Sequence, residues 1–391
     1  MITIDTTIQA RRRGAPTMTS TRSDGILLTG GTGFLGGAVA AELLSGPHWP
    51  RTLLLVRAPS QAEGASRLSA NLRRFGVDDT LLARIAPDQI LCGDLSDADA
   101  FAGDARLPAI TRVLNCAAVT SFGSHPLIWR TNVDGTLAFA RAMYRLPRLR
   151  RFLQVGTAMI CGGSPPTLVR EADYPKAGVS HLVEYTASKA EAEARLRAEC
   201  PGESLVIARP AIIVGHSTLG CQPSHSIYWA FRMSDAMQRL LNDPNDCIDV
   251  VPVDFTARSL LLLLLKPELA HRTYHVSAGV GRSTSFREIS AAFGRALGDG
   301  RATDRYQVVT FQDLVDAQDH FHAWFGRCNR RLMLRAMRIY GTFAGLGAVF
   351  DNQRLLDEGA DPPPRFTDYL HRCVETSRGS TVPEQMLVDF M

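Results

Sequence analysis

Short apolar runs recur along the chain between residues 25 and 279. They read GILLTG, TLLLVR, QILCGDL, RVLNCAAV, RFLQVGTAMICG, SLVIARPAIIVG and RTYHVSAG. Because their apolar positions are continuous and do not alternate with polar ones, the runs are typical of parallel strands buried on both faces. Helical patterns such as FLGGAVAAELLSG and EYTASKAEAEARLRAEC separate them. This alternation predicts an α/β fold built on a doubly wound parallel sheet of the Rossmann kind.

The same pattern divides the chain into three regions. Residues 1–23 contain three consecutive arginines with no apolar run after them, so we expect a disordered tail and no signal peptide. Residues 24–220 form the predicted Rossmann domain, with strand contributions from about 248–280. Residues 221–391 predict a smaller, mainly helical substrate-binding region. The leucines of 260–265 fall far short of the ~20 apolar residues of a membrane span, so we expect a buried helix there.

Composition narrows the class of protein. With 45% hydrophobic and 21% charged residues, the chain resembles an ordinary soluble globular protein. The net charge of +4 is too small to indicate a nucleic-acid partner, and the chain carries no nucleic-acid motif. Eight scattered cysteines form no C-x-x-C pair, which favours free thiols in a reducing cytosol over disulfides or a metal site. We therefore expect a cytoplasmic protein without a bound metal.

A glycine motif, T-G-x-x-G-x-x-G, follows the first apolar run from Thr29 to Gly36. Gly30 permits a tight turn, Gly33 lets the backbone approach a diphosphate, and Gly36 lets the next helix pack closely on the sheet. The diphosphate would lie at the helix N-terminus, where free N–H groups and the helix dipole favour an anion. Glycines also mark plain turns, but their place between a strand and a helix favours a dinucleotide site.

The end of the second run indicates which dinucleotide binds. Chains that bind NAD usually carry Asp or Glu about 20 residues beyond the glycines, where it binds the ribose hydroxyl. Here Arg57 stands at that place, and Arg67 follows in the next segment. A guanidinium can bind a 2′-phosphate through two parallel hydrogen bonds. The sequence therefore favours NADPH, although an arginine could also stand there by chance in so arginine-rich a chain.

Two further strand ends fit a dinucleotide site. Asp94 and Leu95 close the third run, where the carboxylate could bind the adenine amino group, and small residues around Ala117 close the fourth. Alone, each is an ordinary turn, and only their order after the glycine motif makes them informative. The residues predicted to contact the cofactor are Thr29, Gly30, Gly33, Phe34, Leu35, Gly36, Arg57, Arg67, Asp94, Leu95, Ala117, Asn132, Tyr185, Lys189, Pro210 and Ile213.

A tyrosine and a lysine stand four residues apart in YTASKAEAE, so Tyr185 and Lys189 share a helix face. Three of the 43 basic residues are lysines, which leaves 43 − 3 = 40 arginines, and a lysine kept here indicates chemistry that arginine cannot do. We expect Lys189 to bind the nicotinamide ribose. With the positive nicotinamide ring, it would lower the pKa of the Tyr185 phenol from about 10 toward neutrality. Thr157, at the end of the fifth run, would hold the substrate oxygen. The alternative is a core tyrosine and an ordinary strand-end threonine.

The order of these motifs, with NVDGT at 132–136, resembles the extended short-chain dehydrogenase/reductase superfamily. Three stretches are similar to its fatty acyl-CoA reductase/thioester reductase ("male sterility") branch: LVRAPSQAEGASRLSANLRRFG, NCAAVTSF and IDVVPVDFTARSLL. The resemblance covers about residues 24–290. Gly156 departs from it, since the branch commonly has Ser before the threonine, and so does Asn115, where many thioester reductases have His.

The resemblance implies NADPH-dependent reduction of an acyl thioester to an aldehyde, or on to an alcohol, with Thr157, Tyr185 and Lys189 as the catalytic residues. The thioester would be carried by coenzyme A or by an acyl or peptidyl carrier protein supplied in trans, because the chain has no D-S-L carrier tripeptide. One alternative is a related reductase or epimerase acting on a ketone, an alcohol or a sugar nucleotide. Another is a non-catalytic regulator that senses NADP.

The stretch RRLMLRAMRIY adds an open question about the C-terminal region. Arg331, Arg335 and Arg338 share one face of a predicted helix, beside a largely apolar face. Such a helix could dock an acidic carrier protein, make peripheral contact with a membrane, or cover an acyl chain. A domain helix with a solvated arginine face explains the pattern equally well.

Overall fold

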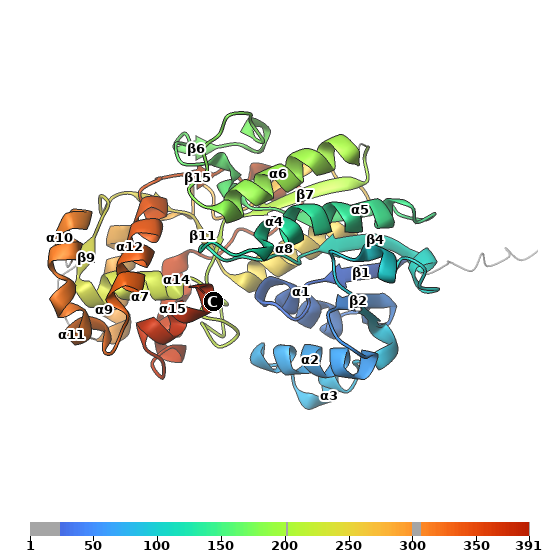
Figure 1. The fold of residues 1–391 in the computed structure, drawn as a ribbon, viewed down its shortest axis with the longest axis horizontal. Helices are drawn as coiled ribbons and strands as arrows, with labels where there is room; N and C mark the ends of the chain where they lie inside the picture. The colour runs from blue at the N-terminus through green and yellow to red at the C-terminus, as the bar shows by residue number, and fades with distance from the viewer. Residues whose placement is uncertain (1–23, 201, 299–305, 391) are drawn as a thin grey trace, which may run out of the picture.

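The computed structural model describes residues 24–200, 202–298 and 306–390, so the predicted tail at 1–23 lies outside the described residues. At its centre is a seven-stranded parallel sheet with the order β3-β2-β1-β4-β5-β7-β12 (Figure 1). Its strands are β1 (Gly25–Thr29), β2 (Thr52–Val56), β3 (Ile90–Cys92), β4 (Ile110–Asn115), β5 (Arg151–Val155), β7 (Leu205–Pro210) and β12 (Thr273–Val276). All seven apolar runs of the sequence contribute a strand to this sheet, which confirms the predicted doubly wound α/β fold.

Helices cover both faces of the sheet because each strand alternates its side chains between two apolar cores. In β1, Ile26 and Leu28 face the first core and Leu27 faces the second. The first core is covered by α1 (Phe34–Ser45), α2 (Gln61–Arg74) and α8 (Val253–Leu265), and the second by α5 (Thr136–Tyr144) and α6 (Glu184–Glu199). The leucine run 260–265 ends α8 and packs into the first core, which confirms the predicted buried helix. Across the described ranges, no helix is both long and apolar enough to cross a membrane.

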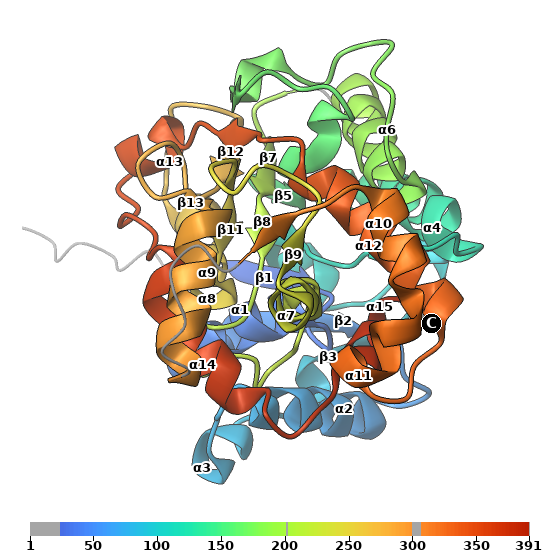
Figure 2. The ribbon, with the colours of Figure 1, turned by 90° about the vertical axis from the view of Figure 1, so that its left-hand side faces the viewer.

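A mainly helical region lies beyond the carboxyl end of β7 (Figures 1 and 2). Its longer helices are α7 (Tyr228–Met237), α9 (Phe286–Leu297), α12 (Arg330–Ala344), α14 (Phe366–Thr376) and α15 (Val382–Phe390). Shorter helices are α10 (Phe311–Asp316), α11 (Phe321–Phe325) and α13 (Gln353–Asp357), while α3 (Asp79–Leu82) and α4 (Leu127–Trp129) belong to the sheet part.

Two-residue strands also pair with one another outside the seven-stranded sheet. They are β8 (Ile212–Ile213) with β11 (Val250–Val251), β6 (Leu168–Val169) with β15 (Val349–Phe350), β9 (Arg239–Leu240) with β14 (Gln307–Val308), and β10 (Cys247–Ile248) with β13 (Thr284–Ser285). Because β8 follows β7 directly, the pair β8–β11 carries the chain from the sheet into the helical region. The region therefore faces the sheet edge at which ligands of open α/β sheets bind.

Candidate active site

The loop after β1 leaves room for an anion. Gly30 has a φ of +74°, which favours glycine, and a Cβ at Gly36 would lie 2.2 Å from the carbonyl oxygen of Gly30. Gly33 is the exposed N-cap of α1, and no side chain caps this helix. The N–H groups of its first residues, Phe34 and Leu35, therefore remain available to a ligand. This arrangement fits the diphosphate of a dinucleotide, which would fill the space that the glycines leave open.

The side chains of Thr29 and Asn71 fix this loop through hydrogen bonds within the protein. The hydroxyl of Thr29 donates to Asn115 Oδ1 at 2.5 Å and accepts from the backbone N–H of Ala117 at 3.1 Å. The amide of Asn71, on α2, donates to two carbonyl oxygens of the loop at 3.0 and 2.9 Å. Asn71 belongs to no sequence motif, so it was not identified from the sequence. The one available signal was its position, since it is an asparagine on the apolar face of an amphipathic helix. Thr29 is engaged within the protein, so its direct contact with a cofactor stays a prediction.

The ends of β2 and β3 bring opposite charges together. The guanidinium of Arg57 lies 3.8 Å from the Asp94 carboxylate, and 75% of the Arg57 side chain is exposed. Arg67 donates to the carbonyl oxygen of Arg57 at 2.5 Å and to Glu63 at 2.7 Å. Asp94 also accepts hydrogen bonds from the N–H and hydroxyl of Ser96. Both arginines thus meet at the end of β2, and the exposed guanidinium of Arg57 is accessible to a phosphate.

The other residues predicted to contact a cofactor differ in their exposure. Leu95 is buried in the second core, so at this edge it can offer a ligand only its backbone. Ala117 is partly exposed just beyond β4. Pro210 ends β7 and is buried, whereas Ile213 in β8 is partly exposed. All four lie near the carboxyl ends of the strands.

The structure brings the predicted catalytic residues together at this same edge. Tyr185 and Lys189 lie one turn apart on α6, and Lys189 Nζ donates to the carbonyl oxygen of Val155 at 3.0 Å. Val155 ends β5, and Thr157 follows two residues later as the N-cap of a short helix, where its Oγ1 accepts from the N–H of Met159 at 3.2 Å. The proton of the Thr157 hydroxyl therefore remains available for donation to a substrate oxygen.

Burial governs the titration of both groups on α6. It raises the pKa of Tyr185 to about 12 and lowers the pKa of Lys189 to about 8. The expectation that Lys189 draws the pKa of Tyr185 toward neutrality is therefore wrong for this structure, because loss of water disfavours the phenolate. The effect of a nicotinamide ring stays a prediction. Tyr185 is a neutral phenol at neutral pH, the form that can donate a proton.

A π-helical turn holds Asn132 between the loop after β4 and α6. The turn spans Arg130–Gly135. Asn132 exchanges hydrogen bonds of 2.8 and 2.9 Å with the backbone of Val119 and donates to the hydroxyl of Ser188 at 3.1 Å. Because Ser188 directly precedes Lys189, these bonds fix the helix that carries the lysine. Such turns are frequent at functional sites. Direct contact between Asn132 and a cofactor stays a prediction.

A buried ion pair also positions α6. Arg209, on β7, has a side chain without exposed surface and donates to both carboxylate oxygens of Glu193 at 3.0 and 2.6 Å. Arg197 donates to the same carboxylate at 2.8 Å. Glu193 lies one turn beyond Lys189, so this pair fixes the rotation of α6 against the sheet.

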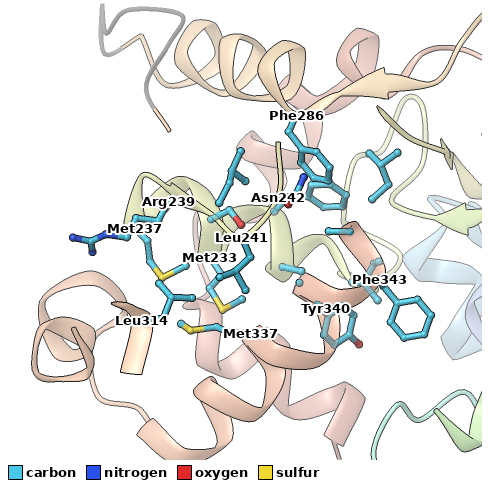
Figure 3. Close-up of a pocket in the computed structure, with 18 of the residues that line it drawn as sticks. Met233, Met237, Arg239, Leu241, Asn242, Phe286, Leu314, Met337, Tyr340 and Phe343 are labelled. Atoms are coloured by element: carbon cyan, nitrogen blue, oxygen red, sulfur yellow. The ribbon is translucent and has the colours of Figure 1, made fainter. Parts of the chain in front are cut away.

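Aromatic rings connect Tyr185 to the helical region. The ring centroid of Phe122, in the loop after β4, lies 5.8 Å from that of Tyr185 and 5.2 Å from those of Tyr340 and Phe343 on α12. Tyr340 and Phe343 also line a pocket between α7 and α12 (Figure 3). Phe122 therefore contacts both Tyr185 and two residues that line the pocket.

Helix α12 divides its residues between this pocket and solvent. Arg331, Arg335 and Arg338 are exposed, as their shared face in the sequence predicts. Met337 and Tyr340, on the opposite side, are buried and line the pocket. The helix thus covers an apolar space with one face and presents arginines to solvent with the other.

Comparison with known proteins identifies relatives of the chain. A family model described as "Male sterility protein" matches residues 28–260. The non-canonical nonribosomal peptide synthetase FrzA of Cladobotryum sp is 29% identical over 272 residues, which cover 64% of this chain and 26% of FrzA. The putative fatty acyl-CoA reductase CG8303 of Drosophila melanogaster is 25% identical over 299 residues, which cover 63% of this chain and 54% of that protein. The chain thus spans about a quarter of the synthetase and about half of the reductase.

Solved structures share the fold. The terminal R domain of the myxalamid PKS-NRPS biosynthetic pathway superposes with a TM-score of 0.71 at 21% identity, covering 92% of both chains. The reductase domain of a nonribosomal peptide synthetase from Mycobacterium tuberculosis gives a TM-score of 0.65 at 22% identity, covering 93% of this chain and 92% of that one. In both cases the likeness extends over the sheet and the helical region.

Proposed function

Because the chain belongs to the male sterility protein family of reductase domains, we propose that it reduces an acyl thioester to an aldehyde with NADPH. The observation that carries the proposal is the convergence of Thr157, Tyr185 and Lys189 at the carboxyl edge of the sheet, beside an open glycine loop. The thioester would be carried by coenzyme A or by an acyl or peptidyl carrier protein. The aldehyde would be the first product, and a second reduction to the alcohol would use the same residues.

The choice of NADPH rests on the end of β2. Arg57 has an exposed guanidinium there, and Arg67 is held against its backbone by a hydrogen bond of 2.5 Å. An arginine at this place can bind a 2′-phosphate through paired hydrogen bonds, which a ribose hydroxyl does not require. Asp94 lies 3.8 Å from Arg57 and would compete for it in the absence of a phosphate.

Each residue of the site has a task in the reaction. Bound NADPH would supply the hydride that reaches the thioester carbonyl carbon. Thr157 would donate a hydrogen bond to the carbonyl oxygen, and the neutral phenol of Tyr185 would give it a proton as negative charge develops. Lys189, held by the Val155 carbonyl, would stabilise the phenolate that remains. The carbon–sulfur bond then breaks, and the sulfur leaves as a thiol with the proton of the new hydroxyl.

The test follows NADPH oxidation and free thiol together, over panels of acyl-CoA, acyl-carrier, aldehyde and ketone substrates. We expect one thiol for each NADPH consumed in the first reduction, and loss of both signals in Tyr185→Phe. Tyr144→Phe is the matched control, because Tyr144 lies on α5 with its ring 5.9 Å from that of Phe152, in the second core and away from the site.

Other results would assign a different function. NADPH oxidation with ketones or aldehydes alone, without thiol release, would make the chain a reductase of carbonyl compounds. Binding of NADPH without turnover of any substrate in the panels would support a cofactor-sensing regulator.

A further inference from the structure

We infer that the pocket between α7 and α12 binds the alkyl tail of an apolar, unbranched acyl group, and that Phe122 determines which acyl groups reach it. The inference rests on the proposed thioester reduction and names its substrate class. The pocket is lined by side chains of both helices and of the strand pairs next to them.

The position of the pocket suits a chain attached to the reacting carbonyl. Tyr340 and Phe343 lie at the end nearer to the sheet, and both contact Phe122, whose other neighbour is the ring of Tyr185. Ile212 lines the pocket as well, and it lies two residues beyond the end of β7. The ring of Phe122 and the chain that follows β7 thus both connect the site with this apolar pocket.

The chemistry of the lining favours an alkyl chain over a peptide. Met233, Met237 and Met337 lie together with Leu314 at the end far from the sheet (Figure 3). Unbranched thioether side chains adapt their shape to flexible apolar ligands. A peptidyl group would bring N–H and C=O groups that need partners, and burying each one without a partner costs about 1–3 kcal/mol.

The few polar side chains around the pocket do not change this conclusion. The guanidinium of Arg239 points away from the other lining side chains (Figure 3) and lies 4.6 Å over the ring of Trp324. Ser234 and Asn242 contribute single polar groups to a lining that is otherwise mainly apolar. An extended chain of polar groups would find too few partners there.

Phe122 contacts residues of both the reacting centre and the pocket. Its ring centroid lies 5.8 Å from that of Tyr185 and 5.2 Å from those of Tyr340 and Phe343. An acyl chain must displace or slide past this ring to enter, which an unbranched chain does with less strain than a branched or aromatic one. Phe122 is therefore a specificity-determining residue, and Phe122→Ala should raise the ratio of benzoyl to octanoyl thioester turnover.

The first experiment measures kcat/KM for pantetheine thioesters from acetyl to palmitoyl. We expect a rise of about fourfold for each added methylene until the pocket is full, since burying a methylene contributes about 0.8 kcal/mol. Ala230→Phe, which fills the pocket from α7, should abolish the rise, so that kcat/KM for long chains falls toward that for acetyl. Ala236→Phe is the matched control, because Ala236 is exposed on the same helix and does not line the pocket.

A binding experiment separates this inference from the proposed function. Displacement of a fluorescent polyene fatty acid by n-alkanols requires no turnover. Chain-length-dependent displacement that Ala230→Phe abolishes would support the pocket even if no thioester were reduced. Thioester turnover that is independent of chain length, or equally steep in wild type and Ala230→Phe, would overturn the inference and leave the proposed reduction intact.

Discussion

Replacing Lys189 with methionine should stabilise the protein at neutral pH while it removes the cation of the proposed catalytic site. Lys189 is 5% exposed, and burial lowers its pKa from 10.5 to about 8. The folded state therefore binds its proton less tightly than the unfolded state does. Below pH 8 the protein carries the full penalty of a buried ammonium, and its stability rises with pH between about 8 and 10.5. Methionine has a similar length and no charge, so it avoids this penalty.

The size of the effect follows from the two pKa values. A difference of 10.5 − 8 = 2.5 units corresponds to about 3 kcal/mol at neutral pH. Loss of the hydrogen bond to Val155 offsets about 1 kcal/mol, so we expect a net gain of about 2 kcal/mol. At about pH 9.5 the folded protein has lost the Lys189 proton while the unfolded chain keeps it, so only about one pKa unit of the penalty remains. The stability gain of Lys189→Met should then be smaller than roughly 1 kcal/mol.

Urea denaturation of wild type and variant at about pH 7 and about pH 9.5 tests this. Fluorescence can follow unfolding, because Trp49 in the sheet part and Trp229 in the helical region are both buried. Lys176→Met, at an exposed position, should give the same small change at both pH values. A change for Lys189→Met that is equal at the two pH values would show that Lys189 titrates alike in both states, and destabilisation at neutral pH would show that the buried ammonium carries no net penalty; either result contradicts the prediction.

Three further predictions concern the surroundings of the site. Arg57→Ala should lower kcat/KM for NADPH by about tenfold to hundredfold and leave that for NADH nearly unchanged, and an equal loss for both would contradict the phosphate role. Glu193→Gln should destabilise the fold by about 3–5 kcal/mol in chemical denaturation, because it leaves the Arg209 guanidinium buried without its charged partner, and a loss below about 1 kcal/mol would show that the pair is not needed. Gly156→Ala should cost no more than about 1 kcal/mol, because a Cβ there meets nothing closer than 3.6 Å, and a marked fall in melting temperature would contradict this.

The sheet could be predicted from sequence because local pattern alone specifies it. Each of the seven apolar runs supplies a strand, and the glycine motif lies where the turn after β1 needs a positive φ at Gly30. The spacing of Tyr185 and Lys189 likewise predicts their shared face, since it depends only on helix geometry. Features of this kind are encoded within a few residues.

Contacts between distant segments could not be predicted in this way. Phe122 and Tyr340 are 218 residues apart in sequence, and no pattern in either segment indicates that their rings stack. The bonds from Asn71 to the glycine loop depend in the same way on how α2 packs beside α1. The burial that raises the pKa of Tyr185 could not be predicted either, because the sequence shows a neighbouring lysine but not how deeply the phenol lies.

The most direct test of the central claim uses NADPH that carries deuterium at the transferable position of the nicotinamide. Incubated with an acyl thioester and a hydrazine trap, the protein should yield an aldehyde hydrazone with deuterium at the former carbonyl carbon and release thiol in equal amount. Free carboxylic acid with thiol and no deuterium transfer would identify thioester hydrolysis and contradict the account.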